Sequence, residues 1–233
     1  MLTPELLAKL RAFDTPTICN ALEIIDAKYR VTGFTTKPLV CPFPDLPPIV
    51  GYARTATIRA THTNEAEGKA GKAQRIAYYE YVASGGPAPS VMVIQDLDGA
   101  DIGYGAFWGE VQSAVHRGLG CEGVVTDGSI RDIPQWAPNF QALAGSIAPS
   151  HAWVHLADFG KQVRVHGMIV RSGDLIHADR HGACVIPAAV ADKIPAACDL
   201  LTRKEAVILG VARKKGFNMD QLREALNKMD EIH

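Results

Sequence analysis

Residues 91–126 read VMVIQDLDGADIGYGAFWGEVQSAVHRGLGCEGVVT, and this stretch decides the fold class of the chain. It begins with an apolar run at 91–94 and ends with another at 123–126, as expected of strands covered on both faces. Between them, a glycine-rich connector leads into a segment at 109–118 along which Val111, Val115 and Leu119 repeat every four residues, as in a helix. Strand, loop, helix and strand form a βαβ unit, which predicts an α/β fold with parallel strands and a right-handed crossover.

Helices are predicted at both ends of the chain. Thr3 and Pro4 begin an amphipathic helix, and a second helix begins at residues 15–17. Residues 188–215 are predicted to be helical despite Pro195, and Asn218 or Asp220 begins the last helix.

The remaining segments are predicted as a loop, a third helix and short strands. Five prolines between residues 37 and 48 indicate an extended loop. A helix is expected at 65–82, and strands are expected at 51–63, 142–147, 163–169, 174–176 and 183–186. No repeat or linker interrupts the pattern, so we expect a single domain over residues 1–233, with a C-terminal helical extension at 191–233.

Composition narrows the class of protein. The chain has 24 Lys+Arg against 25 Asp+Glu, for a net charge of −1, so it lacks the basic excess of a nucleic-acid or membrane-surface binder. No apolar run approaches the length of about 20 residues that spans a membrane. Glu5 and Lys9 occupy the place where a signal peptide needs apolar residues. The five cysteines form no CxxC pair, which is typical of reduced thiols in a cytoplasmic enzyme.

Two loops after the predicted parallel strands are candidate ligand sites, because ligands gather at the carboxyl ends of such strands. The loop at 103–109 leads into a helix whose free N–H groups suit a carboxylate or phosphate. Arg131 and Asp132 follow the second strand of the βαβ unit. They offer a guanidinium fork for a carboxylate and a hard oxygen ligand for Mg²⁺ or Mn²⁺.

Simpler interpretations stay open for these residues. Arg-Asp dipeptides on loops commonly form surface ion pairs. The glycine spacing before Glu110 is GxGxxxG, one residue off the dinucleotide fingerprint, although Asp127 could serve as a ribose-binding acid. The histidine pairs 151/155 and 177/181 have a spacing that suggests zinc only on a helix, and they fall in strand-and-turn segments. We therefore interpret His177 and Asp179 as a structural hydrogen-bond pair. The tryptophans (Trp108, Trp136 and Trp153) are expected in the core or at subunit contacts.

The segment WGEVQSAVHRGLGCEGVVTDGSIRD, residues 108–132, resembles the signature of the RraA-like family. This family includes class II 4-hydroxy-4-methyl-2-oxoglutarate / 4-carboxy-4-hydroxy-2-oxoadipate aldolases and RraA-type regulators of ribonuclease E. The enzymes' pattern is an acidic residue, twenty intervening positions and Arg-Asp, which Glu110, Arg131 and Asp132 supply here. The resemblance extends to residues 13–19, 170–179 and 182, and so covers roughly residues 13–190, the expected core.

The resemblance implies a β/β/α swivelling-domain fold, assembled as a homotrimer or homohexamer. It implies that a pyruvyl group binds Arg131 and the helix start, and that a divalent metal, Mg²⁺ or Mn²⁺, binds Asp132. The implied residues of the helix start are Gly109, Glu110, Val111 and Gln112. Family sites lie at subunit interfaces, so Glu205 on the C-terminal helix is a candidate to reach a neighbouring site.

These implications favour an enzyme that cleaves a 4-hydroxy-2-oxo acid to pyruvate and also decarboxylates oxaloacetate. No lysine lies within a clean apolar strand, so a metal route is preferred to a Schiff base. The characterised aldolases have aspartate where this chain has Glu110, which puts an acid/base role of this residue in doubt. The regulators tend to lack the aspartate that Asp132 supplies, which favours an enzyme. The alternatives are a non-catalytic regulator that binds a ribonuclease, and another lyase or hydratase acting on a sugar acid.

Overall fold

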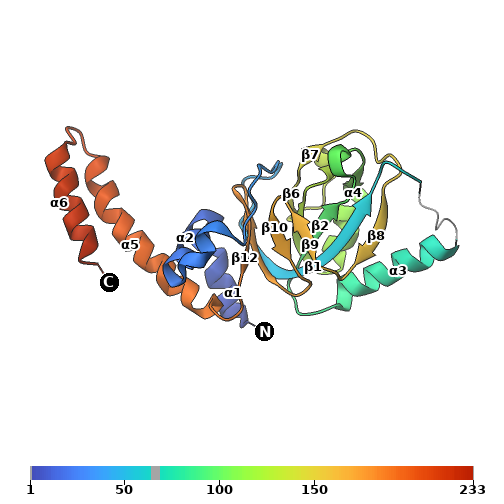
Figure 1. Cartoon of the computed structure of the whole chain (residues 1–233), viewed down its shortest axis with the longest axis horizontal. Helices are drawn as coiled ribbons and strands as arrows, with labels where there is room; N and C mark the ends of the chain where they lie inside the picture. The colour runs from blue at the N-terminus through green and yellow to red at the C-terminus, as the bar shows by residue number, and fades with distance from the viewer. Residues whose placement is uncertain (1, 64–68, 233) are drawn as a thin grey trace.

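The structure, a computed structural model, describes residues 2–63 and 69–232. A mixed, curled sheet forms the centre of a globular body, and a pair of C-terminal helices projects from one side (Figure 1). The order in the sheet is β12-β11-β1-β2-β4-β6, and β8 also pairs with β1. The parallel strands are β1 (Ile49–Arg59), β2 (Ser90–Asp96), β4 (Cys121–Thr126) and β6 (Gln141–Leu143). The antiparallel strands are β8 (His155–Phe159), β11 (Leu175–Asp179) and β12 (Gly182–Ile186).

The predicted βαβ unit is confirmed. β2 and β4 pair in parallel, and α4 (Glu110–Gly118) lies between them in the chain. Their residues are almost wholly buried, because the sheet is covered on both faces here. β1 is also buried along almost its whole length, so its alternating sequence does not indicate a solvent-exposed face.

Beyond the carboxyl ends of these strands, the chain forms a small parallel sheet that the sequence did not predict. It consists of β3 (Ala106–Trp108), β5 (Ser129–Ile130) and β7 (Ser146–Ile147). The predicted strand 142–147 is therefore wrong as a single element. Gly145 separates β6 from β7 and donates its N–H to the Gly128 carbonyl at 3.0 Å.

The predicted strand 163–169 is also two strands, β9 (Val163–Val165) and β10 (Met168–Val170), paired as a hairpin. The turn between them has positive φ at His166 and Gly167, which an extended strand does not allow. The loop rich in proline, by contrast, is irregular as predicted, apart from a single bridge between Val40 and Ala144.

The helices largely follow their sequence signals. Thr3 caps α1 (Pro4–Arg11), and Asp14 caps α2 (Thr15–Ile25). Pro195 lies in the first turn of α5 (Ile194–Ala212), where its missing N–H breaks no hydrogen bond. Asn218 forms a capping box with Gln221 at the start of α6 (Met219–Asp230). α3 spans Lys69–Ser84, and the predicted start of this helix at residue 65 lies outside the described residues. Short 3₁₀ turns are η1 (Ala27–Val31), η2 (Gly99–Asp101), η3 (Ile133–Gln135) and η4 (Ala191–Lys193).

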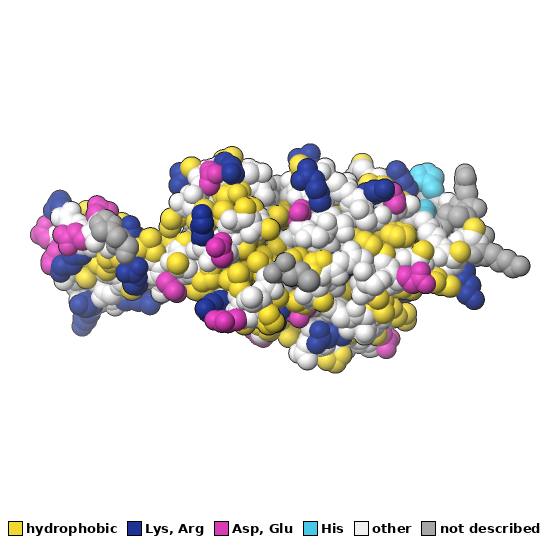
Figure 2. Space-filling model, turned by 90° about the horizontal axis from the view of Figure 1, so that it is seen from below, with side chains coloured by type: hydrophobic (Ala, Val, Ile, Leu, Met, Phe, Trp, Pro, Cys, Tyr) yellow, Lys and Arg dark blue, Asp and Glu magenta, His cyan; other side chains and the backbone are white. Residues whose placement is uncertain are grey.

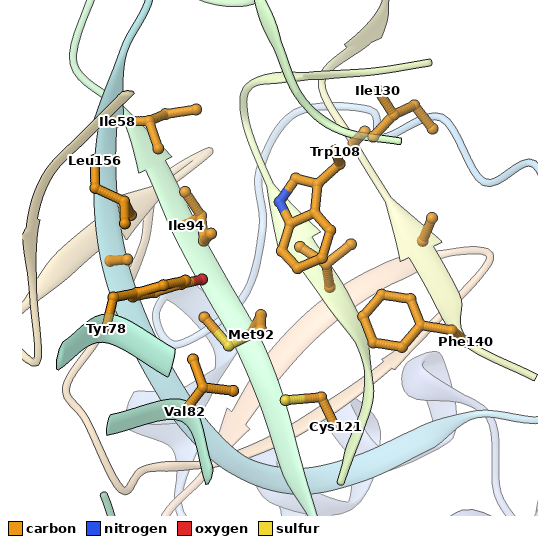
Figure 3. Packing of buried hydrophobic residues seen from close by; sticks show 14 of the residues in the cluster. Ile58, Tyr78, Val82, Met92, Ile94, Trp108, Cys121, Ile130, Phe140 and Leu156 are labelled. Atoms are coloured by element: carbon orange, nitrogen blue, oxygen red, sulfur yellow. The ribbon is translucent and has the colours of Figure 1, made fainter. Parts of the chain in front are cut away.

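Three apolar clusters hold the layers together. One joins the central sheet to α3 and to Trp108 and Ile130 of the small sheet. Figure 3 shows Tyr78 and Val82 of α3 packed over Met92 and Ile94 of β2. A second joins α1, α2 and α5 to the β11–β12 end of the sheet, and a third lies under the β9–β10 hairpin. The expected α/β fold with a βαβ core and helical ends is confirmed.

α5 and α6 form an antiparallel hairpin that leaves the body (Figure 1). Only the first part of α5 contributes buried side chains, at Ile194, Ala197 and Cys198. Figure 2 shows apolar side chains gathered on the underside, where the hairpin meets the body. Apolar side chains that remain exposed along the hairpin are Leu209, Phe217, Met219 and Leu226. No helix in the described part of the chain is both long and apolar enough to cross a membrane.

Candidate functional site

An open cavity of about 990 Å³ lies beside the small sheet. One wall comes from β3, the start of α4 and the residues after β5, and it contains Gly109, Arg131 and Asp132. The opposite wall comes from α3 and from residues 151–156. The loops predicted to be ligand sites therefore meet in one cavity, at the carboxyl edge of the parallel strands.

Arg131 and Asp132 lie side by side on the wall of this cavity. The Arg131 N–H donates to the Trp108 carbonyl at 2.9 Å, which fixes this loop to β3. Asp132 has φ 53° and ψ 35°, a left-handed conformation that non-glycine residues adopt rarely. Arg131 Nε lies 3.6 Å from Asp132 Oδ2, and the two side chains are 36% and 39% exposed. Both side chains therefore stay accessible to a ligand.

Gly109 allows the Asp132 carboxylate to approach the start of α4. A Cβ atom at position 109 would lie 2.5 Å from Asp132 Oδ2 and 3.3 Å from Arg131 Cγ. Gly109 is also the N-cap of α4, and no side chain accepts a hydrogen bond from the first turn. The free N–H groups of that turn, together with Arg131, can hold an anion.

Of the other residues predicted at the helix start, Val111 and Gln112 line the cavity and Glu110 does not. Glu110 is the first residue of α4 and is exposed to solvent. Gln112 accepts a hydrogen bond at Oε1 from the Tyr79 hydroxyl at 3.1 Å, so its amide N–H groups remain free to donate. Tyr79 lines the same cavity and was not among the predicted site residues.

The buried face of α4 differs from the apolar repeat seen in the sequence. Val111 is 70% exposed, whereas Ser113 and His116 are fully buried. Burial lowers the pKa of His116 to about 4, although its hydrogen bond with the Gln112 carbonyl opposes this shift. The ring is therefore neutral, and Nδ1 must carry the proton that bonds to the Gln112 carbonyl at 2.7 Å. Nε2 then accepts from the Tyr78 hydroxyl, also at 2.7 Å.

The wall formed by α3 and residues 151–156 could not be predicted, because these segments lie far from the signature in the sequence. Trp153 is 59% exposed on this wall, whereas Trp108 and Trp136 are in the core as expected. The amide of Gln74 donates to the Leu156 carbonyl at 3.4 Å and so joins the two segments.

The remaining candidates have structural roles. The prediction that His177 and Asp179 form a hydrogen bond with each other is wrong. Instead, His177 Nδ1 bonds the Thr15 hydroxyl at 3.0 Å, and Asp179 accepts the Thr15 N–H at 2.8 Å. Both therefore fix the start of α2 to β11. Asp179 also accepts from the backbone N–H of His181.

Asp127, the candidate ribose-binding acid, is buried, and its carboxylate accepts the Asp96 N–H at 2.7 Å. Burial raises its pKa to about 6, while this hydrogen bond acts in the opposite direction. The Asp127 side chain thus belongs to the interior and does not line the cavity. Glu205 lies on α5, also outside the cavity lining of its own chain.

The donors on the cavity wall fit a hydrated Mg²⁺ or Mn²⁺ ion better than zinc. Asp132 is the carboxylate residue that lines the cavity, and within the described ranges no three His, Cys, Asp or Glu residues form a metal-binding group. Structural zinc needs four protein ligands, whereas Mg²⁺ commonly binds one or two carboxylates and keeps several waters. An accessible aspartate beside an open cavity satisfies the second requirement.

Comparisons with known proteins agree with the fold. The family model RraA-like (Aldolase/RraA) matches residues 15–185. An uncharacterized protein from Pseudomonas syringae pv. tomato str. DC3000 superposes with a TM-score of 0.72 at 19% identity, covering 96% of this chain and 94% of that one.

Streptomyces coelicolor RraAS2, described as an unusual member of the RNase ES inhibitor RraA protein family, gives a TM-score of 0.68 at 21% identity. That match covers 88% of this chain and 95% of the other. The RNA-processing inhibitor RraA from Thermus thermophilis gives a TM-score of 0.50 at 17% identity, covering 70% and 90%. At these identities the superpositions show a shared fold only. No curated protein matches the sequence.

Proposed function

This chain belongs to the RraA-like (Aldolase/RraA) family, and on that premise we propose that it is a divalent-metal-dependent aldolase that cleaves a 4-hydroxy-2-oxo acid to pyruvate. The family contains both lyases and inhibitors of ribonuclease E, so the site must decide between them. The observation that carries the proposal is the accessible Arg131–Asp132 pair beside Gly109, in a cavity large enough for a small acid.

Each side chain of this wall has a role in the proposal. Arg131 and the free N–H groups at the start of α4 bind the carboxylate of the pyruvyl end. The Gln112 amide, oriented by Tyr79, donates to an oxygen of the same group. Asp132 would hold Mg²⁺ or Mn²⁺, and such an ion, when bound, would polarise the 2-keto oxygen as a Lewis acid. Arg131 adds a fixed positive charge near that oxygen.

Glu110 is our candidate for assisting removal of the C4 hydroxyl proton. Its exposed position outside the cavity lining favours a supporting role, through solvent, over direct contact with the substrate. Because oxaloacetate decarboxylation passes through the same enolate, we propose it as a second activity of the site. We further propose that the enzyme works in the cytoplasm as a homotrimer or homohexamer, without a nucleic-acid or membrane partner.

The test is release of pyruvate, coupled to lactate dehydrogenase, from 4-hydroxy-4-methyl-2-oxoglutarate and from oxaloacetate. We expect activity with Mg²⁺ and none with EDTA. Asp132→Ala should lower turnover by roughly 10²–10³, the usual effect of removing a charge-stabilising group. Asp101→Ala, which removes an exposed aspartate from η2, is the matched control and should leave turnover unchanged.

Two results would contradict the proposal. Activity that survives both EDTA and Asp132→Ala would show that the metal assignment is wrong. No activity on any 2-oxo acid, together with tight binding to a ribonuclease, would support the alternative of a non-catalytic regulator. Two of the similar structures are described as inhibitors of RNA processing or members of an RNase inhibitor family. Cleavage or dehydration of a sugar acid alone would support the third candidate, a different lyase or hydratase.

A further inference from the structure

The cavity is much larger than the end of the substrate that the proposed function places in it. Gly109, Gln112, Arg131 and Asp132 account for one wall and for a three-carbon pyruvyl group. A volume of about 990 Å³ lies at the top of the range of roughly 300–1,000 Å³ that is typical of pockets for much larger ligands. The opposite wall must therefore contact the rest of the substrate, beyond C4.

One face of α3 forms much of that opposite wall. Lys72, Arg75, Ile76 and Tyr79 occupy positions i, i+3, i+4 and i+7 of the helix, so they share one of its faces, and all four line the cavity. Ile76 is 49% exposed, and Trp153, on the segment 151–156 of the same wall, is 59% exposed. Large apolar side chains exposed in a cavity are characteristic of a surface that an apolar ligand covers.

The same face of α3 also carries unpaired positive charge. Among the described residues, neither Lys72 nor Arg75 has a carboxylate within ion-pair distance. Among the described residues that line the cavity there are thus three cationic side chains, of Lys72, Arg75 and Arg131, against the single carboxylate of Asp132. In the whole chain the two signs are nearly balanced, at 24 and 25, so this excess is local. Such an excess favours a ligand with a second negative charge.

We propose that the substrate carries an extended apolar segment beyond C4, best filled by an aromatic ring, and that this segment ends in a carboxylate. The proposal rests on the proposed function. The ring contacts Ile76 and Trp153, and the terminal carboxylate binds Lys72 and Arg75. In the cleavage reaction the C3–C4 bond breaks, the C4 hydroxyl carbon becomes an aromatic aldehyde, and C3 takes up a proton to give pyruvate. The hydroxyl proton lost at C4 balances the proton gained at C3.

Binding is measured by calorimetry of the full chain with Mg²⁺ and three 2-oxo acids that cannot undergo aldol cleavage. These are 4-(4-carboxyphenyl)-2-oxobutanoate, 2-oxo-4-phenylbutanoate and 2-oxoglutarate, which is compact. We expect the carboxyphenyl acid to bind about tenfold more tightly than either of the others, since each lacks one of the two contacts.

Two variants assign the contacts. Arg75→Gln should remove the advantage of the carboxyphenyl acid over the phenyl acid. Trp153→Ala should weaken both aromatic ligands about tenfold relative to 2-oxoglutarate. Arg117→Gln, which removes an exposed charge from the far end of α4, is the control and should change none of the affinities. The inference is overturned if 2-oxoglutarate binds as tightly as the aromatic acids, or if both cavity variants behave like Arg117→Gln.

Cleavage is then measured with the 4-hydroxy derivatives of the same acids. Tight binding of the carboxyphenyl acid without release of pyruvate would contradict the proposed function and leave the substrate class standing. Pyruvate release from the compact acid, without preferential binding of the aromatic acids, would support the proposed function and contradict the substrate class. Failure of every 2-oxo acid to bind would overturn both.

Discussion

At the scale of single residues, the absence of a side chain at Gly109 leaves room for the carboxylate of Asp132 at the start of α4. Gly109→Ala should displace that carboxylate and weaken Mg²⁺ binding and turnover by about 10- to 100-fold, an effect typical of disturbed ligand orientation. The fold should be retained, because the side chain that must move is partly exposed. Metal titration and a thermal melt measure the two effects.

Gly118→Ala is the control for this variant. Gly118 is the last residue of the same helix, and a Cβ atom there would meet nothing within 4 Å. Equal metal affinity in the two alanine variants would show that the contact between position 109 and Asp132 has no importance for the site.

Asp127 provides a second prediction at this scale. Its folded pKa of about 6 lies above its ordinary value of 3.8, because it is buried. The folded state therefore binds the proton more tightly than the unfolded state, and ionisation of Asp127 lowers stability as pH rises from about 4 to 6. Asp127→Asn should increase the free energy of unfolding at pH 7 by on the order of 2 kcal/mol.

This gain should shrink as the pH falls from 6 towards 4, which urea denaturation at several pH values can follow. Asp101→Asn, at an exposed aspartate, should show no such trend. A gain that is the same at pH 4 and pH 7 would rule out titration of Asp127 as its cause.

Asp179 has the opposite shift: burial acts to raise its pKa, but the N–H groups of Thr15 and His181 outweigh burial and hold that pKa below its ordinary value.

At the scale of elements, α4 owes its position to a buried polar contact more than to its apolar residues. Tyr78 of α3 and His116 of α4 are both fully buried and share a hydrogen bond of 2.7 Å. Tyr78→Phe leaves His116 Nε2 without a donor in the interior, which should cost about 1–3 kcal/mol of stability. Chemical denaturation measures this loss. Tyr104→Phe, at a side chain that is 62% exposed, is the control, and equal stability of the two variants would refute the prediction.

The elements also show what the sequence could predict. The runs at 91–94 and 123–126 predicted β2 and β4 because a strand buried on both faces has a continuous apolar sequence. Thr3 and Asn218 identified helix starts, since capping is a local interaction. β3, β7 and β8 were missed or merged with neighbours, because two- to five-residue strands are defined by partners distant in the sequence.

The sequence predicted one wall of the candidate site and missed the other. Gly109, Arg131 and Asp132 were predicted to lie together, because they follow parallel strands whose carboxyl ends share one edge of the sheet. The repeat of Val111, Val115 and Leu119 suggested which face of α4 is apolar, but tertiary packing buries Ser113 and His116 instead. Lys72, Arg75 and Trp153 could not be predicted as site residues, because only the folded chain brings α3 and residues 151–156 to the same cavity.

At the scale of the whole molecule, the α5–α6 hairpin projects from the body (Figure 1). It exposes apolar side chains that the body of the same chain does not cover. Self-association would bury them, so we expect light scattering after size exclusion to give three or six times the 25.1 kDa of one chain. Met219 is 61% exposed on the hairpin, and Met219→Glu should shift the population toward a single chain.

Lys214→Glu, which changes the charge of an exposed residue beside the same turn, is the control for this variant. A molar mass of one chain for the unmodified protein would show that the homotrimer and homohexamer predictions are wrong. An unchanged mass for Met219→Glu would place the contact elsewhere on the surface.

The close approach of Gly109 to Asp132 also has an evolutionary consequence. A side chain at position 109 and a carboxylate at position 132 compete for the same space, so we expect the two positions to change together. Where the carboxylate is absent, position 109 should accept larger residues. Positions 109 and 132 should therefore covary among related proteins, and replacement of the glycine should identify relatives that lack the metal-dependent activity.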